Sequence, residues 1–560
     1  MRLSGARIVV EAIKAEGIET VFGYPGGQAL PLYDAIYDSG LHHVLTRHEQ
    51  GAVHAADGYA RRSGKVGVCI STSGPGATNL VTGIATANMD SIPLVCITCQ
   101  VPRASIGKDS FQEADIMGVT TPITKHNFLV QDTNELTLTL KKAFYIARTG
   151  RPGPVVVDIP KDILLEEAEF DYSIDLASLN WSYKPKREGS TADLQAILDV
   201  ISRSHSPVLF VGGGVVLSGA SGLLREFVQH TQIPVVASLM GLTAYPTDDP
   251  LHLGMLGMHG TYAANMAVQH ADLLIGLGVR FDDRVTGTLN TFAAGARVVH
   301  LDIDPAEFNK NVRVDYRLAG DLQWSLSLLQ NAETGNLAEW HESCCKWKNE
   351  HPMSYTKSDK VIKPEAVIEA LNDLTKGDAV IATDVGQHQM WTVQYMTFKE
   401  PRTLLTSGGL GTMGFGLPAA MGAALVSDDK PVWLVSSDGS IMMNCQEMAT
   451  LAEENLPVKV LVLNNRGLGM VRQWQRMFFG HRMSASKHEF KMSFAKLGEA
   501  MGCTGITVEK PEDLTAALAR AAAIPGPVVI EVLVDELEDV MPMVAPGKSL
   551  SEMVLEGGDY

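Results

Sequence analysis

The stretch VWLVSSDGSIMMNCQEMATLAEENLPVKVLVLNNRGLG, from Val432 to Gly469, decides the fold. Apolar runs at 432–436 and 458–463 have the composition of buried strands, and residues 441–455 between them have the pattern of a helix. Two buried strands joined by a helix form a βαβ unit, so we expect the strands to be parallel. The polar turns after both strands then meet at the carboxyl edge of the sheet, where open α/β folds bind ligands.

These two turns carry the residue types of a metal and phosphate site. Asp438 offers a carboxylate and Asn465 an amide oxygen, and Mg²⁺ prefers such oxygen ligands together with phosphate and water. Gly439 and Ser440 begin the predicted helix, where free backbone N–H groups favour a phosphate. The alternative is structural: Asp438 and Ser440 cap a helix, and Asn465 belongs to an ordinary turn.

Length and composition exclude several classes of protein. The chain has 560 residues, too many for one hydrophobic core, and its 45% hydrophobic and 20% charged residues are typical of a globular protein. A net charge of −18 argues against a nucleic-acid partner. Apolar runs of membrane-spanning length are absent, and residues 1–17 lack the character of a signal peptide, so we expect a cytoplasmic protein without a membrane partner.

The seven cysteines are scattered and indicate neither disulfides nor a metal site. Cys96 and Cys99 form a Cys-x-x-Cys pattern, but the surrounding LVCITCQ has the character of a buried strand. Because residues three apart on a strand point to opposite faces, we do not expect a shared metal ion. All seven are predicted to be reduced thiols.

Apolar strands and helices alternate along the chain in three sets. This pattern predicts an α/β protein with three doubly wound parallel-sheet domains. We place the domains at residues 1–165, 190–345 and 360–540, with a carboxyl-terminal tail at 541–560. Residues 166–190, which are first acidic and then basic, are predicted to be a linker.

Three turns of the first domain follow predicted strands and should lie at one sheet edge. They are YPGG at 24–27, the turn into an Ala- and Gly-rich helix at Glu49, and SGPGATN at 73–79. A glutamate at a helix amino terminus is stabilised by the helix dipole and often has no other role. The spacing alone therefore leaves Glu49 either as a structural residue or as part of a catalytic site.

With these motifs in view, the whole chain is similar to the catalytic subunit of the acetohydroxyacid synthase family, also called acetolactate synthase, whose members use thiamine diphosphate. The Asp-Gly turn and the following Asn-Asn resemble the diphosphate and metal motif of such enzymes. Successive parts of the family are matched by GYPGG, RHEQGA, TSGPGATN, GRPGPVVVDIPKD, GVRFDDRVTG, SGGLGTMGFGLPAA and GMVRQWQ. Ser437 and Cys99 depart from the pattern, since each replaces an expected glycine.

The resemblance implies that pyruvate is decarboxylated on thiamine diphosphate and that the two-carbon unit passes to pyruvate or 2-ketobutyrate, in branched-chain amino acid biosynthesis. It implies Mg²⁺ held by Asp438, Asn465 and the carbonyl group of Gly467, and an FAD without a redox role. Glu49 is expected to hydrogen-bond the aminopyrimidine ring, where a carboxylate stabilises the imino tautomer that takes the C2 proton. Met413 is expected to hold the cofactor in a bent shape.

The site residues implied by the resemblance form four further sets. The catalytic set is Glu49, Gln112, Lys161, Met470 and Trp474. The thiamine diphosphate set is Gly26, Glu49, Pro75, Asn79, Val385, Gln387, His388, Gly411, Met413, Gly439, Ser440 and Met470. The FAD set is Arg151, Gly212, Gly213, Gly214, Met258, His259, Arg280, Asp283, Arg284, Asp302, Ile303 and Asp321. The substrate set is Phe111, Lys161, Arg280 and Trp474.

Helical spacing also places Met470, Val471 and Trp474 on one face of a predicted helix. By resemblance, this face lines the site for the acceptor keto acid. A lone tryptophan is more often a core residue, and only the full match of GMVRQWQ to the family favours the binding role.

The resemblance also implies partners. Glu49 and Asp438 lie in different domains, and in the resembled family they come from different subunits, so a homodimer or a dimer of dimers is expected. A separate regulatory small subunit is a further expected partner. The sequence alone does not decide whether the two residues meet within one chain or between two.

Three other functions stay open. They are an FAD-dependent pyruvate oxidase, a flavin-free catabolic acetolactate synthase and a catalytically inactive homologue. The RFDDR motif and Trp474 argue against the flavin-free enzyme, and the presence of Glu49, Asp438 and Asn465 argues against the inactive homologue.

Overall fold

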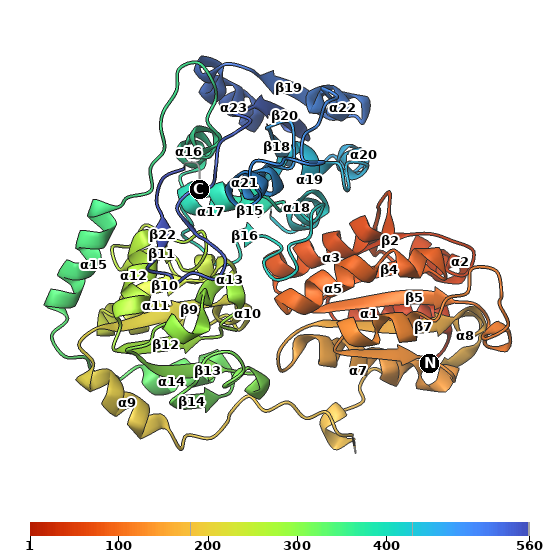
Figure 1. The fold of residues 1–560 in the computed structure, drawn as a ribbon. Coiled ribbons are helices and arrows are strands. Elements are labelled where there is room, and N and C mark those ends of the chain that lie inside the picture. The colour runs from red at the N-terminus through yellow and green to blue at the C-terminus, as the bar shows by residue number, and fades with distance from the viewer. Residues whose placement is uncertain (180, 428, 558–560) are drawn as a thin grey trace.

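The computed structural model describes residues 1–179, 181–427 and 429–557, and it contains three α/β units (Figure 1). Each unit is built on a six-stranded parallel sheet with helices on both faces, which confirms the predicted fold class. Within the described ranges, no helix is both long and apolar enough to span a membrane.

The amino-terminal sheet has the strand order β3–β2–β4–β5–β7–β6. The strands are β2 (Thr20–Tyr24), β3 (His42–Leu45), β4 (Gly67–Thr72), β5 (Leu94–Gln100), β6 (His126–Leu129) and β7 (Pro154–Pro160). One face packs on α1 (Gly5–Ala15), α2 (Leu30–Tyr37), α7 (Leu136–Arg148) and α8 (Lys161–Leu165), and the other on α3 (Glu49–Ser63) and α5 (Val81–Asp90). The loops after β4 and β5 carry α4 (Pro75–Thr78) and α6 (Ile116–Thr120), and β1 (Arg2–Ser4) pairs with β8 (Glu167–Glu169).

The two cysteines of β5 confirm the expected alternation along a buried strand. Cys96 lies in the core beneath α3, whereas Cys99 lies in the core on the opposite face of the sheet. All seven cysteines are free thiols. Cys99, which stands where a glycine is expected, is fully buried in β5 and pairs with β4 in unbroken register.

The middle sheet has the strand order β11–β10–β9–β12–β13–β14. The strands are β9 (Pro207–Val211), β10 (Val235–Ala237), β11 (His252–Met255), β12 (Leu273–Leu277), β13 (Arg297–Asp302) and β14 (Tyr316–Ala319). One face packs on α9 (Leu194–Arg203), α10 (Gly213–Leu217), α11 (Ser221–Thr231) and α14 (Leu322–Leu329), and the other on α12 (Tyr262–His270), α13 (Asp283–Thr286) and α15 (Ala338–Glu350).

The carboxyl-terminal sheet has the strand order β16–β15–β17–β18–β20–β19. The strands are β15 (Val380–Thr383), β16 (Leu404–Leu405), β17 (Val432–Ser437), β18 (Lys459–Asn464), β19 (Thr504–Val508) and β20 (Val528–Leu533). One face packs on α16 (Pro364–Thr375), α17 (Gln387–Tyr395) and α23 (Leu514–Ala523), and the other on α18 (Gly416–Ala424), α20 (Glu447–Glu453) and α22 (Phe494–Ala500). Loops at the carboxyl ends of β17 and β18 carry α19 (Asp438–Ile441) and α21 (Gly469–Phe478).

The helix predicted at 441–455 is wrong in its bounds. The first turn, α19, already begins at Asp438, and the helix is then interrupted before it resumes as α20 at Glu447. Asn444 lies in the interruption, where its side-chain amide donates to the carbonyl oxygen of Gly414 at 2.7 Å. This contact ties the chain to a neighbouring loop, and asparagine side chains compete with helical backbone bonding in general.

Helices α3 and α18 join the amino- and carboxyl-terminal units through one shared hydrophobic core (Figure 1). Their backbones approach so closely that a Cβ added at Gly58 would lie 2.1 Å from the carbonyl oxygen of Ala419. A Cβ at Gly422 would lie 1.9 Å from the carbonyl oxygen of Ala55. The small residues of α3 are therefore explained by this helix contact.

The tail after β20 returns to the middle unit, where β21 (Met543–Val544) pairs with β22 (Met553–Val554). The Val544 N–H donates to the carbonyl oxygen of Met258 at 2.8 Å, and Val544 and Leu550 are buried in the middle core. The tail is thus an integral part of the middle unit.

Candidate functional site

Three acceptor oxygens converge at the carboxyl edge of the third sheet. The side-chain oxygen of Asn465 lies 3.3 Å from Asp438 Oδ1 and 2.9 Å from the carbonyl oxygen of Gly467. The Asn465 amide nitrogen faces the other way and donates to Gln387 Oε1 at 3.2 Å, while the Gln387 amide nitrogen donates to two further oxygens. This network fixes the orientation of Asn465. Oxygens without a proton between them repel, and a divalent cation removes that repulsion, so the donor set fits Mg²⁺.

Asp438 is buried beside His488, a residue that no sequence motif indicated. Burial raises the pKa of Asp438, and a contact of 2.9 Å between its Oδ2 and His488 Nδ1 opposes that rise. His488 lies in the segment after α21, far from any motif, so its position could not be predicted. A cation at the oxygen cluster would offset the same desolvation of the carboxylate.

The turn after β17 is shaped by small residues. Ser437 caps α19 by accepting a hydrogen bond of 3.4 Å from the Ser440 N–H, and the Ser440 hydroxyl donates to the carbonyl oxygen of Val385 at 2.7 Å. A Cβ added at Gly439 would lie 2.7 Å from a methyl carbon of Leu468 and 3.7 Å from Met413 Cε. The departure at Ser437 therefore supplies a helix cap.

Gln387 and His388 begin α17 next to this turn, and both are buried. Burial lowers the pKa of His388 to about 3, so its ring is neutral. His388 Nε2 is buried without a hydrogen-bond partner. A phosphate contact from His388 is therefore limited to a neutral donor.

Glu49 is the first residue of α3, and its side chain is directed toward the turn after β4. Its Oε2 accepts a hydrogen bond of 2.9 Å from the side-chain amide of Asn79, and Glu49 is 8% exposed. His48 caps the helix by accepting from the Gln50 N–H at 3.1 Å. Because His48 performs the capping, the carboxylate of Glu49 is not needed as a helix cap.

The loop that carries Phe111 and Gln112 lies directly on the Gly74–Pro75 turn. A Cβ added at Gly74, which has φ +57°, would lie 2.6 Å from the carbonyl oxygen of Gln112. Gln112 itself adopts a positive φ of 59°. Lys161 Nζ donates to the carbonyl oxygen of Gly27 at 3.0 Å, which brings it to the turn that also contains Gly26.

The structure thus brings Gly26, Glu49, Pro75, Asn79, Gln112 and Lys161 to one edge of the first sheet. Phe111 is 85% exposed there, and a phenylalanine so accessible is available for a ligand or a second chain. We call this group the amino-terminal half-site, and the group around Asp438 the carboxyl-terminal half-site.

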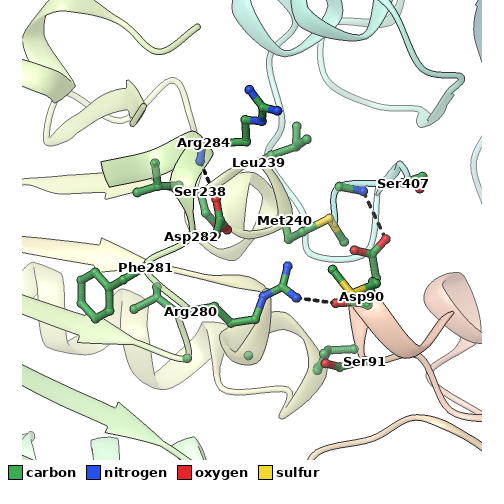
Figure 2. Close-up of a pocket in the computed structure, with 18 of the residues that line it drawn as sticks. Asp90, Ser91, Ser238, Leu239, Met240, Arg280, Phe281, Asp282, Arg284 and Ser407 are labelled. Atoms are coloured by element: carbon green, nitrogen blue, oxygen red, sulfur yellow. Dashed lines mark hydrogen bonds between the residues drawn. The ribbon is translucent and has the colours of Figure 1, made fainter. Parts of the chain in front are cut away.

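A cavity of about 500 Å³ lies where the three units meet (Figure 2). The lining residues from the predicted FAD set are Arg151, Gly213, Gly214, Met258, His259, Arg280, Arg284, Asp302, Ile303 and Asp321. Val385, Gly411, Met470 and Trp474 line it from the carboxyl-terminal unit. The size and the few convergent polar groups are typical of a site for a cofactor or a small ligand.

Two members of the predicted FAD set do not line the cavity. The Asp283 side chain is 83% exposed, and its neighbour Asp282 lines the cavity instead and caps α13 through the Arg284 N–H at 3.1 Å (Figure 2). A Cβ added at Gly212 would lie 2.1 Å from the carbonyl oxygen of Gly278, so Gly212 permits a close backbone approach. Sequence spacing could not distinguish the two adjacent aspartates.

The amino-terminal unit reaches the cavity through Met89 and Asp90 at the end of α5. The Arg280 guanidinium donates to the carbonyl oxygen of Met89 at 2.7 Å. Asp90 accepts from the Gly409 N–H at 2.7 Å and from the buried Arg61 at 2.9 Å. These contacts connect all three units, and no motif in the sequence indicated Asp90.

A second, more open cavity of about 550 Å³ adjoins the first. Met470, Val471 and Trp474 line it from one face of α21, as the helical spacing predicted. Met470 and Trp474 line both cavities.

The two half-sites do not share either cavity. Among the described residues, neither lining includes any member of the amino-terminal half-site.

The comparisons with known proteins agree along the whole chain. Models of thiamine pyrophosphate enzymes match residues 3–119 (N-terminal TPP binding domain), 194–329 (central domain) and 384–532 (C-terminal TPP binding domain). The acetolactate synthase isozyme 2 large subunit of Escherichia coli is 47% identical over 99% of both chains. The acetolactate synthase large subunits of Haemophilus influenzae and Lactococcus lactis are 46% and 47% identical, over 99% and 98% of this chain and 98% and 96% of theirs.

The chain belongs to the thiamine diphosphate-dependent acetolactate synthase family.

The two half-sites differ in their chemistry. The carboxyl-terminal half-site has the oxygen ligands and the tight turn that a metal-bound diphosphate needs. The amino-terminal half-site has a buried carboxylate free of any capping duty.

Proposed function

We propose that this chain is the catalytic subunit of an acetolactate synthase, which joins two pyruvate molecules with loss of carbon dioxide, or pyruvate with 2-ketobutyrate. The observation that carries the proposal is the oxygen cluster of Asp438, Asn465 and Gly467, in a chain that also holds the Glu49–Asn79 pair. Relatives named acetolactate synthase, which match nearly the full length, support the same activity.

Thiamine diphosphate supplies a carbon nucleophile and an electron sink for decarboxylation when bound. Asp438, Asn465 and the Gly467 carbonyl group would hold Mg²⁺, which compensates the diphosphate charge. Met413, which lies next to Gly439, would contact the bound cofactor from the same turn. Glu49 would exchange a proton with the aminopyrimidine ring, and Asn79, which donates to Glu49 Oε2, would orient the carboxylate.

FAD is the proposed ligand of the cavity between the three units. His259 lines the cavity, and its buried Nδ1 has no hydrogen-bond partner among the described residues. This atom is available for a hydrogen bond to a bound group. Gly213 and Gly214 follow strand β9, Asp302 ends strand β13, and all three line the cavity. Glycines allow a phosphate to approach the backbone closely, and a carboxylate can bind a ribose. The proposed role of FAD is structural, because the reaction has no net electron transfer.

The active unit is proposed to be a homodimer or a dimer of dimers, in which each amino-terminal half-site completes the carboxyl-terminal half-site of the other chain. Glu49 and Asp438 belong to different units of the fold, and Phe111 is exposed beside the amino-terminal half-site, which supports this assembly. Relatives described as large subunits support a separate regulatory small subunit as a further partner. We place the enzyme in the cytoplasm.

The acceptor keto acid is proposed to bind beside Trp474, with Phe111, Lys161 and Arg280 as further contacts. Trp474 joins the two cavities and presents a flat apolar surface that suits the extra methyl group of 2-ketobutyrate. An apolar pocket discriminates one methyl group by about 10–200-fold, so a preference for 2-ketobutyrate over pyruvate is expected.

A product assay of the purified protein tests the function. Thiamine diphosphate, Mg²⁺ and FAD are added, and pyruvate is supplied with and without 2-ketobutyrate. Acetolactate from pyruvate alone and acetohydroxybutyrate from the mixture are expected. Acetate formation with oxygen uptake would contradict the proposal and identify an oxidase.

A further inference from the structure

Glu447 of α20 is a carboxylate buried between two units of the fold. Its side chain is inserted beneath the corner that connects β3 to α3, and Glu447 is fully shielded from solvent. The Arg47 N–H donates to both carboxylate oxygens, at 3.0 and 3.1 Å, and the Thr450 hydroxyl donates to Oε2 at 2.9 Å. Glu49 follows Arg47 by two residues, so the corner held by Glu447 leads directly to the proposed catalytic carboxylate.

Gly51 provides the space that this carboxylate occupies. A Cβ added at Gly51 would lie 2.3 Å from Glu447 Oε1, which is closer than atoms can approach. Gly51 lies in the first turn of α3, and glycine is a costly residue inside a helix. The first turn of α3 therefore matches the shape of the Glu447 carboxylate as well as its hydrogen-bonding groups.

The rest of α20 supports the same corner. Thr450 also donates to the carbonyl oxygen of Leu45 at 3.3 Å, and Glu453 pairs with the guanidinium group of Arg47. Just beyond the helix, Glu454 Oε2 lies 2.9 Å from His42 Nε2. Among the three glutamates of this group, Glu447 is the fully buried one, and it accepts from the backbone, so its contact bears on the position of the main chain.

Burial raises the pKa of Glu447 to about 7, against the hydrogen bonds from Thr450 and the Arg47 N–H. A carboxyl group kept at this desolvation cost is tolerated only where hydrogen bonds compensate it. Part of the compensation comes from Thr450 and part from the backbone next to Glu49, and the second part couples the carboxylate to the geometry of the first turn.

We propose that Glu447 is a positioning residue for Glu49. Its carboxylate, bonded to the Arg47 N–H and seated at Gly51, fixes the first turn of α3 so that Glu49 faces Asn79 and the aminopyrimidine. This inference rests on the proposed function, since it assumes that Glu49 assists removal of the C2 proton. Positioning matters because a displacement of about 1 Å at a catalytic group can slow a reaction by about 100-fold.

The first test uses Glu447→Gln and amide hydrogen exchange of the cofactor-free protein. The substitution preserves size but places an amide opposite the Arg47 N–H. At a pH above the raised pKa of Glu447, we expect exchange across residues 45–52 to accelerate by about tenfold or more, because a neutral amide oxygen accepts more weakly than a carboxylate. Exchange in β4 should not change. Unchanged exchange at the corner would overturn the proposal.

The second test measures exchange of the C2 proton of bound thiamine diphosphate. We expect Glu447→Gln to slow it by about 10–100-fold, while the cofactor affinity from calorimetry stays within about threefold, because the Mg²⁺ ligands are unaltered. The matched control is Glu453→Gln, on the same helix and paired with the same arginine, but with a side chain 54% exposed. This control should behave as the wild type.

A double variant separates the positioning role of Glu447 from the proposed catalytic role of Glu49. If Glu447 acts through Glu49, Glu49→Gln with Glu447→Gln should exchange no more slowly than Glu49→Gln alone. Additive slowing, or a normal rate in Glu447→Gln, would overturn the positioning role and leave the proposed function intact. A normal rate in Glu49→Gln would refute the proposed role of Glu49, and the positioning role with it.

Gly51→Ala reaches the same contact from the opposite side and serves if Glu447→Gln does not fold. Its added methyl group would occupy the place of the carboxylate, whereas alanine itself favours the helix. We expect the same acceleration of amide exchange and the same slowing at C2. Wild-type behaviour in both measurements would contradict the proposal.

Discussion

At the scale of single residues, Glu49 is the group on which the proposed chemistry depends. It is buried and bonded to Asn79, and His48 already caps the helix. We therefore predict that Glu49→Gln keeps the fold but slows exchange of the cofactor C2 proton by roughly 10²–10⁴-fold, the usual contribution of general acid–base catalysis. A variant that exchanges at the wild-type rate would assign Glu49 a structural role only.

Asp438 tests the proposed metal site at the same scale. Asp438→Ala removes one of three converging oxygens and leaves the diphosphate charge uncompensated. We predict that Mg²⁺-dependent retention of thiamine diphosphate is lost, as measured by calorimetry with and without Mg²⁺. The control is Asp373→Ala, which changes an exposed aspartate of α16 and should not alter binding. Equal affinity in Asp438→Ala and wild type would refute the metal site.

Trp474 concerns the choice of acceptor. We predict that Trp474→Leu loses most of the preference for 2-ketobutyrate while still forming acetolactate from pyruvate, because the flat surface that contacts the extra methyl group is removed. One methyl group in an apolar pocket contributes about 1–3 kcal/mol. Competition between the two keto acids, scored as the product ratio, is the measurement. A wild-type ratio would place the acceptor elsewhere.

The position of a site residue could be predicted from the sequence where a motif places a characteristic residue type at the end of a strand. Asp438 and Asn465 meet because parallel strands end at one edge. Contacts that depend on tertiary packing could not be predicted, as His488 and Asp90 illustrate. The distinction between Asp282 and Asp283 also required the structure, because it depends on where α13 begins.

At the scale of elements, the contact between α3 and α18 has no room for a side chain. We predict that Gly422→Ala destabilises the protein by about 1–3 kcal/mol, the usual cost of overpacking, because its Cβ would meet the carbonyl oxygen of Ala55. The matched control is Gly222→Ala in α11, where a Cβ has open space and should stabilise by up to about 1 kcal/mol. Unfolding in urea measures both, and equal effects would contradict the packing argument.

The elements also mark the limit of prediction from periodicity. Continuous apolar runs located the strands of the third sheet closely, since buried parallel strands have that composition. The same reasoning predicted one helix where the structure has a break between α19 and α20. In the break, Asn444 donates to the carbonyl group of Gly414, which lies in a loop distant in the sequence, and periodicity does not reveal such a contact.

At the scale of the whole molecule, the cavity between the three units predicts a stabilising ligand. We expect the protein to purify yellow, and its FAD to stay oxidised during turnover with pyruvate. Adding FAD to stripped protein at about 100 times its Kd should raise the free energy of unfolding by about 2.7 kcal/mol, because binding favours the folded state. A flavin that bleaches at the rate of product formation would favour the oxidase instead.

The path of the tail has a consequence for synthesis of the protein on the ribosome. Val544 and Leu550 complete the core of the middle unit, although the sheet of that unit ends at Ala319. At roughly 5–20 residues per second, translation needs roughly 11–46 s more to reach them. During that interval the nascent middle unit exposes the apolar surface that the tail will cover, and chaperones that bind such surfaces should be found on this nascent chain until its last segment emerges.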